Sequence, residues 1–174
     1  MATDTAALEA VRRQITDRGI EFLFAQFVDM YGRPSAKLIP AAHLDGLVED
    51  GAGFAGFAAG EIGQLPSDPD IAAMPDLATF TPVPWQPNLA RFACDVTVEG
   101  EAWPYCPRTI LRNVLGQAAA QGYEFKIGIE LEYFLVQLNA DGTIEIADKL
   151  DTLDKPCYDM AGLTRQYEFL TTVS

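Results

Sequence analysis

The chain has 174 residues, of which 49% are hydrophobic and 21% are charged, a balance that is typical of a globular protein and excludes wholesale disorder. Its formal net charge of −13 argues against nucleic acid or an anionic membrane surface as a partner. The sequence contains no signal-peptide pattern and no run of eighteen apolar residues, and its three cysteines fit neither a disulfide framework nor a zinc site. We therefore expect a cytoplasmic protein with buried thiols at Cys94, Cys106 and Cys157.

The first elements are clearly delimited. Apolar residues at a helical period predict a helix over residues 4–18. The runs 21–29 and 36–40 flank a turn that contains Gly32, which is typical of a β-hairpin. Residues 41–50 are predicted to form a short helix.

The middle of the chain is less regular. Residues 51–76 are rich in Gly, Ala and Pro and show no period, so we expect a long irregular connection with a functional or mobile character. Short strands are predicted over residues 79–85, where two prolines indicate an edge strand, and over residues 90–98. A helix follows, with Pro107 in its first turn and Gly122 just beyond its end.

The last part alternates again between strand and helix signals. Residues 128–136 are predicted to form a strand that turns at residues 139–142 and pairs with residues 143–148. Asp159 can cap a helix over residues 160–173. Because no Gly, Pro or polar tail closes that helix, we expect the polypeptide to belong to a longer protein.

Two carboxylates interrupt the otherwise apolar strand GIELEYFLV. Side chains two residues apart share one face of a strand, so Glu130 and Glu132 should point to the same side. One interpretation is a solvated sheet face, because Lys126 shares their parity. The other is a site for a hard divalent cation, since two close carboxylates repel each other unless a cation neutralises them. Their spacing alone leaves both interpretations open.

Five motifs in order resemble the glutamine synthetase superfamily. The resemblance covers the chain from about residue 20 to the end, and the closing run from Ala147 is most similar to the branch of type III-like glutamine synthetases and γ-glutamylmethylamide synthetases. The motifs are FVDMYGRPSAKLIP (27–40), GFAGFA (53–58), SDPDIAAMPDLATFTPVPW (67–85), ACDVTVEGEAWPYCPRTIL (93–111) and GIELEYFLV (128–136).

This resemblance implies an α+β fold. Residues 1–15 would form an N-terminal helix and residues 16–107 a β-grasp domain. Residues 108–174 would begin the catalytic α/β domain.

The resemblance also implies an ATP-dependent ligase that joins the γ-carboxylate of L-glutamate to ammonia or to a small amine such as methylamine through γ-glutamyl phosphate. Glu130 would bind the Mg²⁺ or Mn²⁺ ion nearer the ATP phosphates, and Glu132 the ion nearer the glutamate. The family builds its active sites between subunits of a homo-oligomer. Its remaining metal, nucleotide and glutamate residues lie beyond residue 174, so we expect the chain alone to be inactive.

Two residues are candidates for the amine pocket. Ala55 stands where bacterial glutamine synthetases have an aspartate that helps to hold ammonium, which favours a substrate with a methyl group, unless other residues hold ammonium. Tyr158 matches an aromatic residue beside the amine, although it could equally pack under a helix start. Lys37 and Arg108 are expected to be structural residues that pair with acidic neighbours.

A different class of function is also compatible with the sequence. The chain could be a non-catalytic β-grasp module that assembles or regulates an oligomer. The mass of the native protein distinguishes the two hypotheses, because the module predicts about 19 kDa.

Overall fold

The computed structural model describes residues 4–59 and 64–173. Contacts divide the chain into two compact units, Met1–Phe125 and Lys126–Ser174. Within the described residues, no helix combines the length and the apolar character that crossing a membrane requires. The catalytic domain was predicted to begin at residue 108. The division at residue 125 follows from contacts within the chain, whereas residue 108 follows from the family resemblance. The contacts therefore do not test the domain boundary at residue 108, which stays a prediction.

The first unit opens with the predicted helix, α1 (Thr5–Arg18), whose two ends are set by its sequence. The carboxylate of Asp4 accepts hydrogen bonds from the backbone N–H groups of Ala6 and Ala7, which would otherwise have no partner in the first turn. Gly19 ends the helix in the left-handed conformation, with φ at 63°.

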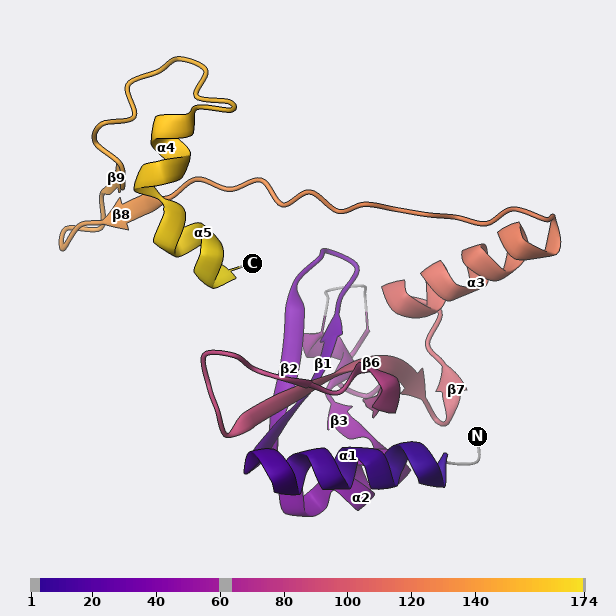
Figure 1. Ribbon diagram of the computed structural model, residues 1–174. Coiled ribbons are helices and arrows are strands. Elements are labelled where there is room, and N and C mark those ends of the chain that lie inside the picture. The colour runs from indigo at the N-terminus through magenta and orange to yellow at the C-terminus, as the bar shows by residue number, and fades with distance from the viewer. Residues whose placement is uncertain (1–3, 60–63, 174) are drawn as a thin grey trace. The chain divides into compact units, whose positions relative to one another are not determined.

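A mixed sheet forms the body of this unit (Figure 1). Its strand order is β2-β1-β6-β4-β3, in which β1 and β6 are parallel and the other neighbours are antiparallel. Two very short strands, β5 and β7, also pair with β6. The strands are β1 (Phe22–Val28), β2 (Pro34–Pro40), β3 (Ala52–Phe54), β4 (Ile71–Pro75), β5 (Thr81–Pro82), β6 (Leu89–Val98) and β7 (Glu101–Ala102).

The core lies between one face of this sheet and the two helices α1 and α2 (Leu44–Asp50) (Figure 1). Alternation along β1 buries Leu23, Ala25 and Phe27. The helices contribute buried aliphatic residues to the same cluster, Val11 from α1 and Leu44 and Leu47 from α2. The predicted hairpin and both predicted helices are thus confirmed.

The expectation for residues 51–76 is wrong in its main point. The segment supplies two strands, β3 and β4, and its residues Ala52, Ile71 and Ala73 are buried. Short strands of small residues carry little sequence signal, and the pairing of β4 with β6 and of β3 with β4 is a tertiary effect that local composition does not show. Residues 60–63 of this segment lie outside the described residues.

The turn between β1 and β2 is organised by a buried carboxylate. Asp29 is 2% exposed, and its side chain accepts hydrogen bonds from the backbone N–H groups of Tyr31 and Arg33. It also forms an ion pair with the side chain of Arg33 at 3.2 Å. The backbone N–H of Arg33, helped by that of Tyr31, lowers the pKa of Asp29 below its usual value although burial acts in the opposite direction.

This arrangement predicts a pH-dependent stability. An aspartate in the unfolded chain titrates near about pH 3.9, and the folded pKa of Asp29 lies lower. The ionised carboxylate therefore stabilises the fold fully above that pH, and the stabilisation is lost as the pH falls through the folded pKa. We expect Asp29→Ala to unfold at less urea than the wild type at pH 7, and the difference to shrink below about pH 4.

Urea titrations at several pH values measure this effect. Asp17→Ala is a matched control, because Asp17 is an exposed carboxylate on α1. A stability difference for Asp29→Ala that stays constant down to pH 2 would show that the turn does not depend on the ionised form.

After the sheet, α3 (Pro107–Ala120) begins with Pro107 and is followed by Gly122 at φ 83°, as predicted.

Two of the three thiols, Cys94 and Cys106, are buried, and burial raises the pKa of Cys94 to about 12. The expectation that Cys157 is also buried is wrong, because this residue is exposed.

The second unit contains a hairpin and two short helices. These are β8 (Val136–Leu138), β9 (Ile144–Ile146), α4 (Met160–Arg165) and α5 (Tyr167–Val173). The predicted cap at Asp159 is confirmed, but the single predicted helix is divided at Gln166, whose φ of −100° and ψ of 11° interrupt the helical backbone. None of the described residues in this unit is buried, so it has no core of its own.

Candidate functional site

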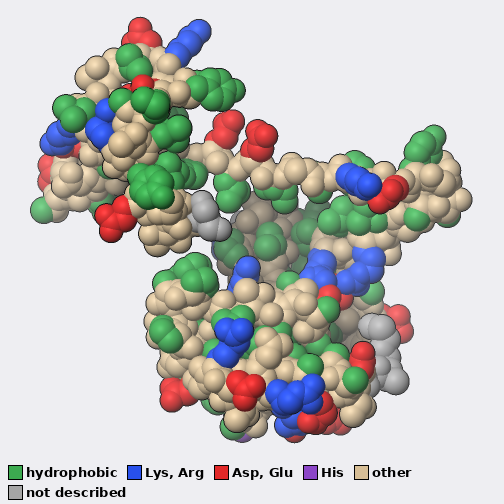
Figure 2. All heavy atoms as spheres, viewed as in Figure 1, with side chains coloured by type: hydrophobic (Ala, Val, Ile, Leu, Met, Phe, Trp, Pro, Cys, Tyr) green, Lys and Arg blue, Asp and Glu red, His purple; other side chains and the backbone are tan. Residues whose placement is uncertain are grey.

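The segment that carries Glu130 and Glu132 is not the strand that the sequence predicted. Residues 123–135 have no regular secondary structure, and only Val136–Leu138 of the following stretch pairs, with β9. Hydrophobic and acidic side chains are both exposed along this stretch (Figure 2). Glu130 and Glu132 are themselves exposed, and neither lines the cavity of this unit.

The physical reason is the lack of a partner strand. A strand needs a neighbour for its backbone N–H and C=O groups, and β9 reaches only as far as the partner of Val136. Ile129 and Leu131, which should face a core in a folded strand, are 79% and 82% exposed. An exposed segment with this many apolar residues is suited to form a strand when another strand pairs with it.

The donor chemistry of the pair fits a hard cation. Two glutamates offer carboxylate oxygens, the ligands that Mg²⁺ and Mn²⁺ prefer. Among residues 4–59 and 64–173, no group of three or more His, Cys, Asp or Glu side chains is placed to hold a metal ion. Two carboxylates alone do not make a complete ligand set, and the metal roles of Glu130 and Glu132 stay a prediction.

A pocket of about 350 Å³ that is open to solvent lies between the hairpin and the two helices of the second unit. Its wall is mostly aromatic and aliphatic, with three aspartates, Asp148, Asp151 and Asp159. Asp148 is paired with Arg165 at 2.7 Å, and that hydrogen bond lowers the pKa of Asp148. Asp159 accepts the N–H groups that begin α4, from Ala161 and Gly162.

Tyr158 lies at the edge of this pocket. Its side chain is 99% exposed, and its backbone has a positive φ of 64°, which is uncommon for a tyrosine. The alternative of a tyrosine packed under the start of a helix is therefore not what the structure shows. A freely exposed ring remains available to a ligand or to another part of the protein, and its role beside the amine stays a prediction.

Ala55 lies in the first unit, at the start of the short 3-10 helix Gly56–Ala58. Its carbonyl accepts the N–H of Ala58 at 3.0 Å, and its side chain is half-buried. A Cβ atom on the neighbouring Gly56 would lie 2.5 Å from the side-chain amide nitrogen of Gln64, so a larger residue there would require that flexible side chain to move.

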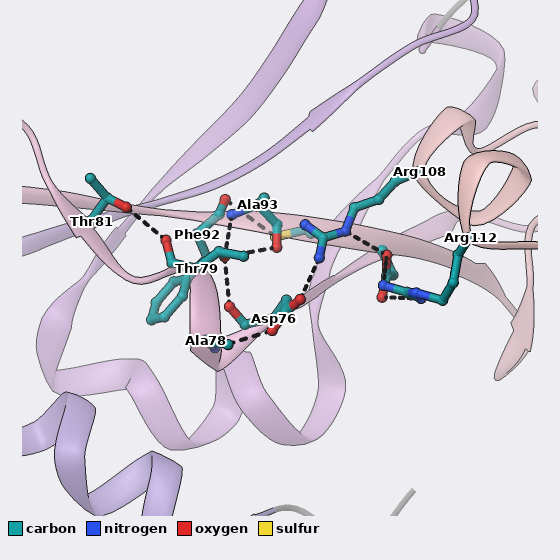
Figure 3. A network of polar contacts seen from close by, with 10 residues as sticks. Asp76, Ala78, Thr79, Thr81, Phe92, Ala93, Arg108 and Arg112 are labelled. Atoms are coloured by element: carbon teal, nitrogen blue, oxygen red, sulfur yellow. Dashed lines mark hydrogen bonds and ion pairs between the residues drawn. The ribbon is translucent and has the colours of Figure 1, made fainter. Parts of the chain in front are cut away.

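Arg108 is structural, as expected, but its partners were not predicted. It forms ion pairs with Asp76 and with Asp95, the latter at 3.0 Å, and Arg112 joins the same Asp95 at 2.9 Å (Figure 3). No local sequence signal joins residues that lie 17 and 32 positions apart. Lys37, in contrast, lies over the ring of Phe54, with its amino group 5.2 Å from the ring centroid.

Comparison with known proteins places these observations in a family. The family model described as "Glutamine synthetase, catalytic domain" matches residues 104–171. A glutamate–methylamine ligase of Methyloversatilis universalis is 42% identical over 161 residues, which are 92% of this chain and 36% of that protein. A glutamine synthetase of Rhizobium leguminosarum bv. phaseoli is 35% identical over 157 residues, 90% of this chain and 35% of that protein.

Solved structures agree. The ligand-free structure of GmaS matches with a TM-score of 0.75 and 34% identity over 91% of this chain and 37% of that one. A GmaS complex with ADP matches with a TM-score of 0.76 and 34% identity over 91% and 36%. The chain thus spans about a third of the length of the relatives it matches. In sequence and in its mixed fold of helices and strands, this chain belongs to the glutamine synthetase superfamily.

Proposed function

We propose that this chain is the N-terminal part of an ATP-dependent ligase that joins the γ-carboxylate of L-glutamate to methylamine or ammonia. The observation that carries the proposal is the 42% identity to a glutamate–methylamine ligase over 92% of the chain. The aligned region is long enough to extend through both units, so the positions of Ala55, Glu130 and Glu132 lie within it.

The proposed reaction has two steps. The γ-carboxylate of glutamate attacks the γ-phosphorus of ATP and gives γ-glutamyl phosphate and ADP. The amine then attacks the acyl carbon, and phosphate leaves with one of the former carboxylate oxygens. Divalent cations held in part by Glu130 and Glu132 would neutralise the charge on the transferring phosphoryl group.

In this proposal the chain's own residues have separate tasks. Glu130 and Glu132 bind the cations through their carboxylate oxygens, and their exposure leaves those oxygens available. Ala55 and Tyr158 contact the amine. A homologous structure that was solved with ADP supports a nucleotide as ligand.

The first unit has the architecture that we assign as a β-grasp domain. The supporting observation is the strand order β2-β1-β6-β4-β3 with a parallel central pair and helices packed on one face. We further propose that the protein forms a homo-oligomer with active sites between subunits, in which this domain completes the site of a neighbour.

The experiment is an amine survey with the full-length protein that carries this chain. Phosphate release should require ATP, glutamate, Mg²⁺ or Mn²⁺, and an amine, and methylamine and ammonium should be the best amines. Phosphate release without any dependence on glutamate would contradict the ligase.

Ala55 provides a sharper test of which amine is used. Burial of the methyl group of methylamine against Ala55 is worth about 0.8 kcal/mol, or about fourfold in affinity. Ala55→Asp would polarise the same space and strengthen hydrogen bonds to ammonium. We expect this substitution to raise the ammonium-to-methylamine ratio of kcat/KM about fourfold or more.

Ala55→Asn is the matched control. Residue 55 stands at the start of a 3-10 helix, so either side chain can cap the backbone N–H groups there, but only Asp adds a charge. Equal ratios in Ala55→Asp and the wild type would remove Ala55 from the amine pocket.

A further inference from the structure

We propose that Asp95 holds α3 on the sheet of the first unit by an ionic latch, rather than by apolar packing. The latch consists of Asp76, Asp95, Arg108 and Arg112 (Figure 3). It lies in the first unit, and its two arginines, but not its aspartates, fall at the start of the region that the catalytic family model matches.

The first argument is what α3 lacks. The helix has no buried residue, and its large aliphatic side chains Ile110, Leu111 and Val114 are exposed. It also has no side-chain cap and no acidic residue in its first turn. A helix of 14 residues is marginal in water without tertiary contacts, so its attachment must come from something other than a buried apolar stripe.

The second argument is how the sheet side of the latch is fixed. Asp95 lies on β6, directly opposite Met74 of β4, and Asp76 follows the end of β4. The backbone N–H of Asp76 donates to the carbonyl of Ala93 at 3.0 Å. The backbone of both aspartates is thus held by contacts between neighbouring strands, which do not involve the arginines of the helix.

The third argument is the asymmetry of the network. The carboxylate of Asp95 accepts hydrogen bonds from both terminal nitrogens of Arg112, at 2.9 and 3.2 Å. It also forms an ion pair with Nε of Arg108 at 3.0 Å. Asp76 pairs with Arg108 and uses its other oxygen to accept the N–H of Ala78. Asp95 therefore joins two successive turns of the helix to the sheet, whereas Asp76 joins one.

The latch should respond to salt. The side chains of the two aspartates and Arg108 are between 23% and 31% exposed, and Arg112 is 55% exposed. Ion pairs that are open to solvent are screened when the Debye length falls to about 3 Å in 1 M salt. Buried apolar contacts would not be weakened in this way.

Amide hydrogen exchange of the 174-residue chain tests the proposal. At low salt, Asp95→Asn should speed exchange of the α3 amides about tenfold and leave β6 amides unchanged. Asp76→Asn should have a smaller effect, and Asp95→Glu should restore part of the protection. In 1 M NaCl the wild type should approach Asp95→Asn, while the variant itself should respond little to salt.

Two further variants keep the test decisive. Arg112→Leu removes the same contact from the exposed side of the helix, so it tests the latch even if Asp95→Asn disturbs the sheet. Asp45→Asn removes an ion pair with Arg12 elsewhere in the unit and should leave α3 unaffected. Protection of α3 that changes neither with salt nor with Arg112→Leu would overturn the proposal.

Discussion

Glu130→Ala and Glu132→Ala, made one at a time in the full-length protein, should each lower the rate of ligation by about two orders of magnitude. In the proposed site, each substitution would remove an oxygen ligand of a cation that would neutralise the charge on the transferring phosphoryl group. The loss should appear in kcat as well as in the apparent affinity for metal, because the charge develops mainly in the transition state.

Initial rates of phosphate release across a range of Mg²⁺ concentrations measure this effect. Glu145→Ala is the matched control, since Glu145 is an exposed glutamate of the same unit that pairs with Lys149. Near-normal activity of either variant at saturating metal would contradict a metal role. It would favour the other interpretation of their spacing, in which the two glutamates lie on a solvated sheet face.

The 174-residue chain by itself should show no glutamate-dependent phosphate release. The described residues contain no three-residue cluster that could hold a metal, and none of those that belong to the second unit is buried. The chain also covers about a third of its relatives, so most of the length over which they build their sites is missing. The expected effect is therefore complete loss relative to the full-length protein.

This assay needs a purified chain that is shown to be folded. Far-ultraviolet circular dichroism and the urea transition of the first unit provide that control. Turnover by the isolated chain that depends on both glutamate and amine would mean that its residues form a working site, which would contradict this account of Glu130 and Glu132.

Where local signals and tertiary packing agreed, the sequence predicted the structure. Asp4 and Gly19 delimit α1 as expected, and the alternation in β1 identifies its buried face. In both cases the determining interactions lie within a few residues of each other, so a pattern in the chain contains them.

Features that depend on distant partners were missed. β3 and β4 are held by pairing with each other and with β6, and Asp95 reaches arginines 13 and 17 positions away. The predicted strand over residues 128–136 fails for the complementary reason. Its composition suits a strand, but among the residues that the structure describes, residues 128–134 belong to no strand pair, and Leu135 adds only one backbone hydrogen bond, which its carbonyl accepts from Ala147. Glu130 and Glu132 were identified from spacing and resemblance, not from geometry.

The central claim is that this chain belongs to a ligase that works through γ-glutamyl phosphate. It is tested most directly with the full-length protein, ATP, methylamine and glutamate labelled with ¹⁸O in its γ-carboxylate. Mass spectrometry of the released phosphate should find one ¹⁸O atom for each molecule of γ-glutamylmethylamide formed. Phosphate that carries no ¹⁸O, while ATP is consumed, would contradict the claim, because the carboxylate oxygen would then never have been bonded to phosphorus.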